Sequence, residues 1–294
     1  MASTYITTGE NKSSKTKTLL SRVLSYAFLI FVSLLALFPF IIMIVNSTRT
    51  GAEISGGFSL LPGGSFIENF SAAWSDPNMV LWRGMLNSFI IAVASSFLTV
   101  YFSAMTAYGI HVYDFKGKNF AFKFILLIMT IPTQVAAVGF VALVRQVGLD
   151  NTYWPLIVPA IAAPSVFFYM KQYMDSTLPL EVIEAARVDG SNEFKTFNII
   201  ALPMMKPAIA VQLIFAFTAS WNNFFTPNLL IDKAELKTLP IMISTLRTNV
   251  ASGNSSALGR IYMTMFLAIL PVIIVYICVS KHIVQGVALG AVKG

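Results

Sequence analysis

The sequence has 294 residues, of which 56% are hydrophobic and only 11% charged, and its mean hydropathy is +0.73. This composition excludes an ordinary soluble domain and is typical of a protein embedded in a bilayer. The formal net charge is +7, but the basic residues flank apolar runs, which indicates membrane topology and lipid contact rather than nucleic-acid binding.

Six apolar stretches are each long enough to cross a bilayer as a helix, which takes roughly 20 residues. The fourth is interrupted by three prolines, and such breaks survive in a membrane only where neighbouring helices satisfy the freed backbone groups, so we expect it inside the bundle. The predicted spans cover residues 23–46, 85–110, 120–144, 153–173, 208–231 and 261–280.

The distribution of basic residues predicts the orientation of these spans. With the N-terminus inside, 13 of the 20 Lys and Arg residues fall on the cytoplasmic side, as the positive-inside rule requires. We therefore predict a cytoplasmic tail at 1–22, a membrane domain over 23–281 and a cytoplasmic tail at 282–294. The external segment 47–83 is rich in glycine and proline turn pairs, which predicts an ordered loop with short helical pieces.

The middle of the membrane part holds amides and hydroxyls but no charged side chain. Ion-coupled carriers commonly place an ionisable residue there, and none is present. The amides of Gln134, Asn222 and Asn223 are candidates for lining a path for a hydroxyl-rich solute, or alternatively they hydrogen-bond between helices. The single Cys278, two distant histidines and the lack of a nucleophile and base pair predict neither a metal site nor a catalytic site.

The cytoplasmic loop at about 174–207 is the most unusual internal connection. Pro179 suits a first helical turn and no breaker follows before Val188, so a short helix is expected. Its acids and Arg187 recur every three residues and form a polar stripe beside small apolar residues. An alternative is an amphipathic hairpin lying on lipid, but alanines and acids suit close approach to a protein groove better.

A sharp turn follows this helix. Gly190 permits the left-handed conformation that ends a helix, and Ser191 is predicted to cap the next one. Phe194 and Phe197 are predicted to face back to the membrane domain. The segment is therefore expected to be helix, turn, helix.

The loop contains the residues Glu184-Ala185-Ala186, Asp189-Gly190, Phe197, Leu202-Pro203 and Pro207. These residues resemble the signature loop of a known family, the permease subunits of ATP-binding cassette (ABC) importers. In that family the loop resembles a coupling helix that sits in a cleft of the ATPase subunit. The resemblance implies that Glu184 contacts the ATPase, that Ala185 and Ala186 permit close docking, and that Asp189 with Gly190 holds the turn.

Three further stretches resemble the carbohydrate-uptake permeases, and in particular the second membrane subunit of maltose-type transporters. They are 114–118, 148–152 and 221–224, although Asn223 stands where that family commonly has Asp. The C-terminal stretch also resembles that subunit's tail, which reaches between two ATPases. The resemblance therefore implies tail contacts with the ATPases by Gln285, Gly286, Gly290, Lys293 and Gly294.

The resemblance implies an all-α membrane protein with six transmembrane helices, a cytoplasmic helix-turn-helix coupling loop and the type I ABC importer permease fold. It also implies a multi-pass permease that imports a sugar. The partners that it implies are a homologous permease, two ABC ATPases and an extracytoplasmic solute-binding protein. ATP and magnesium would bind those ATPases, since this chain has no GxxxxGK[ST] stretch and is not expected to be an enzyme. The alternatives are a permease for a non-sugar solute, an ATP-independent carrier, or a membrane scaffold without a solute path.

Overall fold

The computed structural model describes the backbone of residues 12–75, 80–251 and 257–291, and the side chains from residue 19 to residue 278 within those ranges. Every regular element in the described part of the chain is a helix, which confirms the predicted all-α class. The three longest are α1 (Lys12–Ser47), α4 (Leu81–Val112) and α15 (Leu258–Ala291). The helix α1 begins within the predicted N-terminal tail.

The remaining helices are shorter and fall into three groups along the chain. The first group lies in the segment predicted to be external, and the second follows α4. The third begins in the loop predicted to be cytoplasmic, for which we keep the name cytoplasmic loop. In order they are α2 (Gly51–Ser55) and α3 (Phe66–Trp74); α5 (Lys118–Ile128), α6 (Thr133–Gln146), α7 (Trp154–Ile157), η1 (Val158–Ile161) and α8 (Pro164–Thr177); and α9 (Leu180–Val188), α10 (Glu193–Thr196), η2 (Phe197–Ala201), α11 (Leu202–Met204), α12 (Lys206–Trp221), α13 (Phe225–Leu230), η3 (Ala234–Leu236) and α14 (Leu239–Ala251).

Among the described residues, four helical segments are long and apolar enough to cross a membrane, and there are six if each of two bent helix pairs counts as one span. This agrees with six predicted spans, but the third, fourth and fifth are not continuous helices. The axes of α5 and α6 meet at 95°, where Pro132 lacks the N–H that would continue α5. The segment 193–204 meets α12 at 84°, beside Pro203 and Pro207.

The fifth predicted span also ends earlier than expected. We predicted a helix through residue 231, but α12 ends at Trp221 and a separate helix, α13, follows after Phe224. The physical reason is local: amide side chains at Asn222 and Asn223 compete with the helical backbone for hydrogen bonds. The amide of Asn223 accepts a hydrogen bond from the Thr226 backbone nitrogen at 3.3 Å, which starts the next helix.

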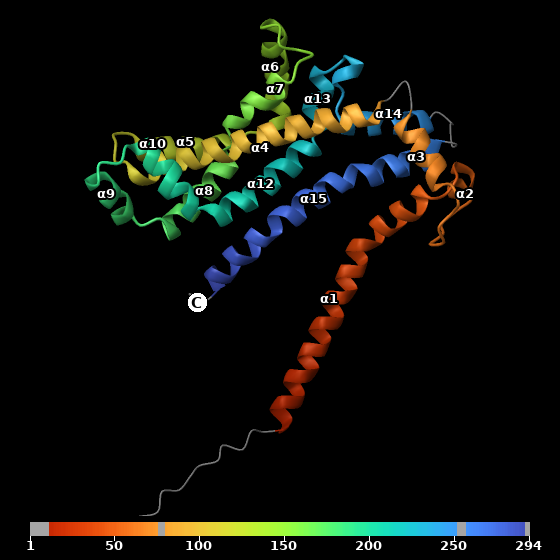
Figure 1. Cartoon of the computed structure of the whole chain (residues 1–294), viewed down its shortest axis with the longest axis horizontal. Helices are drawn as coiled ribbons and strands as arrows, with labels where there is room; N and C mark the ends of the chain where they lie inside the picture. Colours follow the sequence, from red (N-terminus) through yellow and green to blue (C-terminus); the bar gives the residue numbers. More distant parts are fainter. Residues whose placement is uncertain (1–11, 76–79, 252–256, 292–294) are drawn as a thin grey trace, which may run out of the picture.

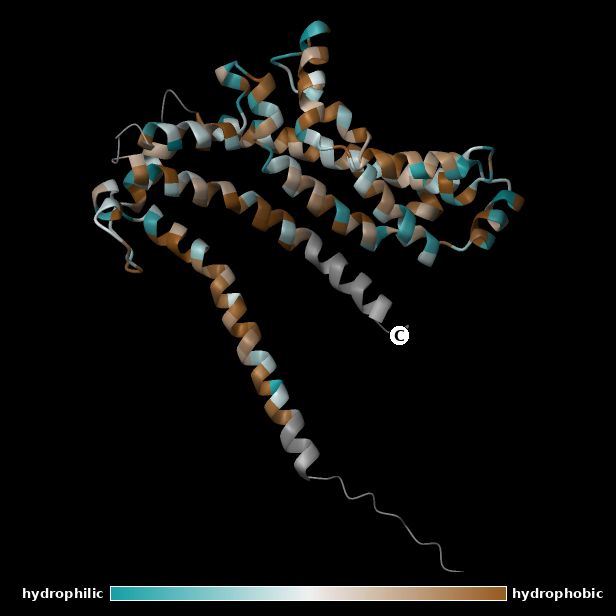
Figure 2. Cartoon of the chain, turned by 180° about the vertical axis from the view of Figure 1, so that it is seen from behind, coloured by the Kyte–Doolittle hydropathy of each residue, from teal (hydrophilic) through white to brown (hydrophobic). Residues whose placement is uncertain are grey.

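The centre of the bundle is α4, which packs against α12 and α8, while α15 packs against α12 and α1. Figure 1 shows α4, α12 and α15 running along one another and α1 diverging from them. The apolar side chains of α1 from Leu19 onward are therefore mostly exposed in the isolated chain, and Figure 2 shows the hydrophobic colouring of this part. Such a surface is stable only against lipid or another membrane helix.

Two hydrophobic clusters hold the bundle together, one toward each end of α4. The cluster near the cytoplasmic loop includes Val100, Ala104, Phe167, Ile183 and Phe197. The cluster near the external side includes other residues of the same long helices, with segments of α3, α14 and α15: Ala73, Leu81, Ala92, Phe217, Trp221, Leu239, Met263 and Leu267. Between them, the buried residues of α4 are polar: Ser95, Ser96 and Thr99.

The external loop is ordered, as predicted, and contains α2 and α3. A capping box begins α2: the Thr50 hydroxyl accepts from the Glu53 backbone nitrogen, and the Glu53 carboxylate accepts from the Thr50 backbone nitrogen at 2.7 Å. The hydrogen bond from the Thr50 backbone lowers the pKa of Glu53. Gly259 at the start of α15 lies so close to Asn69 and the Arg49 backbone that a Cβ would clash with both.

Candidate functional site

The short helix of the cytoplasmic loop, α9, begins after Pro179, whose extended backbone (ψ 139°) leads into the first turn. It ends in a Schellman motif. The Ser191 nitrogen donates to the Ala186 carbonyl at 2.9 Å, and the Gly190 nitrogen donates to the Arg187 carbonyl at 3.0 Å. Gly190 has φ +76°, the left-handed conformation that glycine adopts without a Cβ penalty. The predicted helix and glycine turn are confirmed.

The cap of the following helix differs from the prediction. Asn192, not Ser191, is the N-cap of α10, and its side-chain oxygen accepts from the Lys195 backbone nitrogen at 2.8 Å. Ser191 belongs to the end of the preceding motif, and its hydroxyl instead accepts a hydrogen bond from the Thr196 hydroxyl at 2.9 Å. The Schellman motif uses the three residues after α9, which are Asp189, Gly190 and Ser191, so the first residue free to cap is Asn192.

The two faces of α9 are clearly separated. Ile183 and Ala186 are buried against the rest of the chain, so Ala185 is the alanine that reaches the free surface. Glu184 is also exposed, and Val188 is 88% exposed at the end of the helix. The free face of α9 thus combines an acid, a small residue and an unprotected apolar side chain. The exposed Val188 was not singled out from the sequence, because a lone valine in a helix usually signals burial.

The two phenylalanines of the loop do not behave alike. Phe197 is buried in the cytoplasmic cluster with 2% exposure, as predicted, and its ring meets that of Tyr108 at 5.3 Å between centroids. Phe194 is 67% exposed, so the prediction that it faces the membrane domain is wrong. The two residues are three positions apart, and the short helix α10 gives way to a π-helical turn at Phe197. Their side chains therefore point in different directions.

An ion pair joins α9 to α10, and a hydrogen bond to the same carboxylate joins both to the end of α4. Arg187 Nε lies 2.6 Å from Glu193 Oε1, while the buried Tyr108 hydroxyl donates to Glu193 Oε2 at 3.1 Å. The Arg187 guanidinium also lies 5.4 Å from the centre of the Tyr113 ring. Burial raises the pKa of the Tyr113 phenol, so this ring stays neutral beside the pair. The orientation of α9 is thereby linked to α4.

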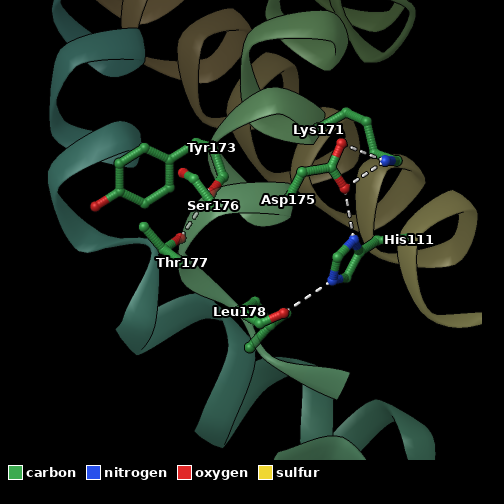
Figure 3. A network of polar contacts seen from close by, with 7 residues as sticks. All are labelled: His111, Lys171, Tyr173, Asp175, Ser176, Thr177 and Leu178. Atoms are coloured by element: carbon green, nitrogen blue, oxygen red, sulfur yellow. Dashed lines mark hydrogen bonds and ion pairs between the residues drawn. The ribbon is translucent and has the colours of Figure 1, made fainter.

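A second polar network joins the ends of α4 and α8 just before α9 (Figure 3). His111 Nδ1 lies 2.8 Å from Asp175 Oδ1, and His111 Nε2 lies 2.9 Å from the Leu178 carbonyl. Both partners are acceptors, so both contacts are hydrogen bonds only when both ring nitrogens carry protons. Lys171 contacts the same carboxylate, with Nζ 2.7 Å from Asp175 Oδ2. The network fixes the chain direction at the entrance to α9.

The three amides predicted to line a solute path lie in three different cavities. Gln134 lines a cavity of about 390 Å³ with Arg145 and α13. Asn222 lines another of about 360 Å³ with Trp221 and Arg247. Only Asn223 borders the largest of the three, which has a volume of about 790 Å³. The amides are separated because α12 ends between Trp221 and Asn223 and because α6 turns away from α5.

The 790 Å³ cavity is bordered by α4, α6, α12 and the broken segment from α7 to α8. Its wall includes one amide that the sequence did not distinguish from other intramembrane polar residues, Gln212 in the middle of α12. Eight polar residues contribute to the lining: Ser95, Thr99, Thr133, Ser165, Gln212, Ser220, Asn223 and Thr226.

The predicted contacts of the C-terminal tail fall mostly outside the described part of the structure. The backbone of α15 extends through Ala291, so Gln285, Gly286 and Gly290 belong to a helix, but their side chains lie outside the described residues. Lys293 and Gly294 lie outside them altogether. The tail contacts therefore stay predictions.

Comparison with known proteins places these features in context. Residues 100–288 match the model of the family described as binding-protein-dependent transport system inner membrane component. The arabinooligosaccharides transport system permease protein AraQ of Halalkalibacterium halodurans is 34% identical over 95% of this chain and 99% of its own. The lactose transport system permease protein LacG of Rhizobium radiobacter is 30% identical over 92% of this chain and 96% of its own.

A solved structure has the same fold. It is described as a bacterial ABC transporter involved in the import of the acidic polysaccharide alginate. The matching chain has a TM-score of 0.74 and 22% sequence identity, with 95% of this chain and 99% of that chain covered. At this identity the likeness concerns the fold alone.

Proposed function

The chain belongs to the family of binding-protein-dependent transport system inner membrane components, and we propose that it is the permease subunit of an ATP-driven sugar importer. It is a multi-pass membrane protein. The observation that carries the proposal is the geometry of α9, a short helix held rigidly at one end of the bundle with an acidic, small-residue face left free.

The partners follow from the family and from the surfaces of this chain. An ATPase subunit would receive the free face of α9, with Glu184 meeting a cationic side chain, Ala185 allowing close approach and Val188 filling an apolar site. Asp189 and Gly190 would hold the turn. The exposed apolar length of α1 suits a homologous permease as well as lipid. An extracytoplasmic solute-binding protein would dock on the external loops, and a second ATPase would serve the partner permease.

This chain would act as a transporter subunit without an ATPase site of its own. Its sequence contains no GxxxxGK[ST] phosphate-binding stretch, so ATP and magnesium would bind to the partner ATPases. When those subunits close, they would move α9, and the ion pair between Arg187 and Glu193 would pass that movement to α4. The result is a switch between inward-open and outward-open arrangements.

We propose that α9 and both termini lie in the cytoplasm. Basic residues support this, because Lys171, Arg187 and Lys195 all lie at the end of the bundle that carries α9. Relatives named for arabinooligosaccharides and lactose support a sugar as the solute. The rival reading is a permease of the same kind for a non-sugar solute. An ATP-independent carrier would need an ion site that this sequence does not show.

The direct test is copurification from mild detergent, followed by an ATPase assay on the purified complex. We expect the wild type to bring down an ATPase and a second permease. Glu184→Lys reverses the charge of the docking face and should lose the ATPase or its coupled activity. Glu235→Lys makes the same change on η3, at the opposite side of the membrane, and should keep both.

Two outcomes would count against the proposal. One is wild type that emerges alone from membranes known to contain the partners. The other is equal loss of ATPase in both variants, which would show that charge reversal acts through general destabilisation rather than through the docking face.

A further inference from the structure

The connection between α8 and α9 is very short. Because α8 ends at Thr177 and α9 begins at Leu180, only Leu178 and Pro179 join the two helices. Both residues have an extended backbone, and Leu178 is 3% exposed. Pro179 adds stiffness, since its ring fixes φ. The direction of α9 relative to the bundle therefore depends on how the backbone of Leu178 is held.

A side chain from another helix holds the Leu178 carbonyl. His111 lies in the last turn of α4, and its Nε2 is 2.9 Å from the Leu178 carbonyl oxygen. Within the described part of the chain, no other hydrogen bond reaches this oxygen. The second ring nitrogen, Nδ1, lies 2.8 Å from Asp175 Oδ1 on α8. Figure 3 shows the imidazole between these two acceptors, so one ring ties the end of α4 both to α8 and to the entrance of α9.

Both contacts of His111 are hydrogen bonds only in the charged form of the ring. A carbonyl and an ionised carboxylate accept hydrogen bonds and donate none, and a neutral imidazole has a single N–H. In the neutral ring, one nitrogen would direct its lone pair at an oxygen within hydrogen-bonding distance. The end of α4 also favours a cation, because the last carbonyls of a helix carry partial negative charge. The geometry therefore selects the doubly protonated imidazolium.

The charges around His111 decide which link is lost when the ring gives up its proton. Lys171 Nζ lies 2.7 Å from Asp175 Oδ2, so this carboxylate keeps a cationic partner on its own helix. Arg187 and Glu193 pair with each other. The other charged side chains of the cytoplasmic loop and of the segment after α4 make no ion pair with the ring in the described structure: Asp114, Lys116, Lys118, Lys123, Glu181, Glu184, Asp189 and Lys195. Deprotonation therefore leaves α8 internally paired and weakens the tie between α4 and the entrance of α9.

We propose that protonated His111 is a positioning residue for α9, and that its deprotonation in an alkaline cytoplasm loosens the link between α4 and the entrance of α9. Histidine ordinarily changes charge between about pH 5 and pH 8. The link is complete while the ring is protonated and weakens as the pH rises. This inference rests on the proposed function, in which α9 carries the movement of the ATPases. It adds a second link beside that of Arg187 and Glu193, and a dependence on pH.

Two measurements on the full chain in lipid nanodiscs test the proposal. Nitrogen-15 NMR of protein labelled at histidine reports whether each ring nitrogen carries a proton. The sequence has two histidines, so His282→Gln leaves the signals of His111 alone, and His111→Gln is the matched variant. Hydrogen exchange of the α9 amides, corrected for the intrinsic effect of pH on exchange, measures how firmly this helix is held.

We expect both nitrogens of His111 to be protonated at about pH 6 and one to lose its proton as the pH is raised to about 9. Protection of the α9 amides should fall about two- to tenfold over the same change, the size of effect of one lost hydrogen bond. His282→Gln should behave as the wild type. His111→Gln should show equal protection at both pH values, because its amide does not titrate. Asp175→Asn keeps an acceptor but removes the negative charge, so His111 should lose its proton at a lower pH.

A neutral His111 ring at about pH 6 would overturn the inference. So would a ring that titrates without any change in α9 protection, and so would an equal fall of protection in His111→Gln, which would assign the pH dependence to other groups. If His111→Gln does not fold, the wild-type titration and Asp175→Asn still decide. Failure of the proposed function is a separate result, because it would appear as a chain that copurifies with no ATPase while both pH measurements stay as expected.

Discussion

The cytoplasmic end of the bundle and the cavity in its middle differ in whether their polar side chains are paired within the chain. At the cytoplasmic end, polar groups are paired with one another, as in the contacts of Glu193 with Arg187 and Tyr108. In the cavity, the amide of Gln212 has no partner among the described residues. The polar groups at the cytoplasmic end therefore use their bonding capacity within the chain, whereas the amide at Gln212 does not.

The two regions also differ in how densely their side chains are packed. Phe197 and Ala208 are completely surrounded in the cytoplasmic cluster, but the side chain of Ala216 borders the cavity. Substitutions should therefore affect stability at one end and uptake in the middle. The following expectations run from the largest effect to the smallest.

Truncation of Phe197 should have the largest effect. Phe197→Ala removes a fully buried ring and should lower the free energy of unfolding by about 3–5 kcal/mol. Phe194→Ala, on the exposed side chain of the same loop, should change it by less than about 0.5 kcal/mol. Thermal unfolding of the purified protein in detergent measures both. Equal destabilisation by the two variants would mean that the burial of this loop has been assigned wrongly.

Enlarging an alanine should distinguish the packed cluster from the cavity. Ala208→Leu adds three carbons where no space exists and should cost about 1–3 kcal/mol of stability. Ala216→Leu, two turns along the same helix, should leave the unfolding temperature near that of the wild type while reducing uptake, because the new side chain enters the cavity. If Ala216→Leu unfolds as early as Ala208→Leu, the space beside Ala216 is not open.

The turn after α9 should be sensitive to backbone strain alone. Gly190→Ala puts a Cβ on a residue with φ +76° and should cost about 1–2 kcal/mol, although nothing lies within 4 Å of the added atom. Gly139→Ala, within α6 and equally free of neighbours, is the matched control and should not destabilise the protein. Hydrogen exchange of the α9 amides would locate the effect, and unchanged protection in Gly190→Ala would contradict it.

Loss of the ion pair at Glu193 should have the smallest effect on stability. Glu193→Gln should cost less than about 1 kcal/mol, since both partners are more than one-third exposed and solvent screens their attraction. Its effect on coupling should be clearer: the uptake obtained per ATP hydrolysed should fall, because α9 loses part of its link to α4. An unchanged ratio of uptake to hydrolysis would show that the movement reaches the bundle through other contacts.

The sequence by itself was enough to identify a membrane protein, six apolar spans and the helix with its glycine turn in the cytoplasmic loop. These features depend on properties read along the chain: hydropathy over about 20 residues, and the conformational freedom of a single glycine. The same local information could not distinguish Phe194 from Phe197, because both are aromatic residues on one short helical segment and their burial depends on which helix lies opposite.

The cavity was decided by the tertiary structure. Gln134, Asn222 and Asn223 are chemically suitable for a solute path, but the bend between α5 and α6 and the early end of α12 place them beside three separate cavities. Gln212 lines the largest one because α4, α12 and the broken segment before α8 leave a space between two packed clusters. Whether a polar side chain meets a partner or an open space depends on the arrangement of distant segments, which no local pattern contains.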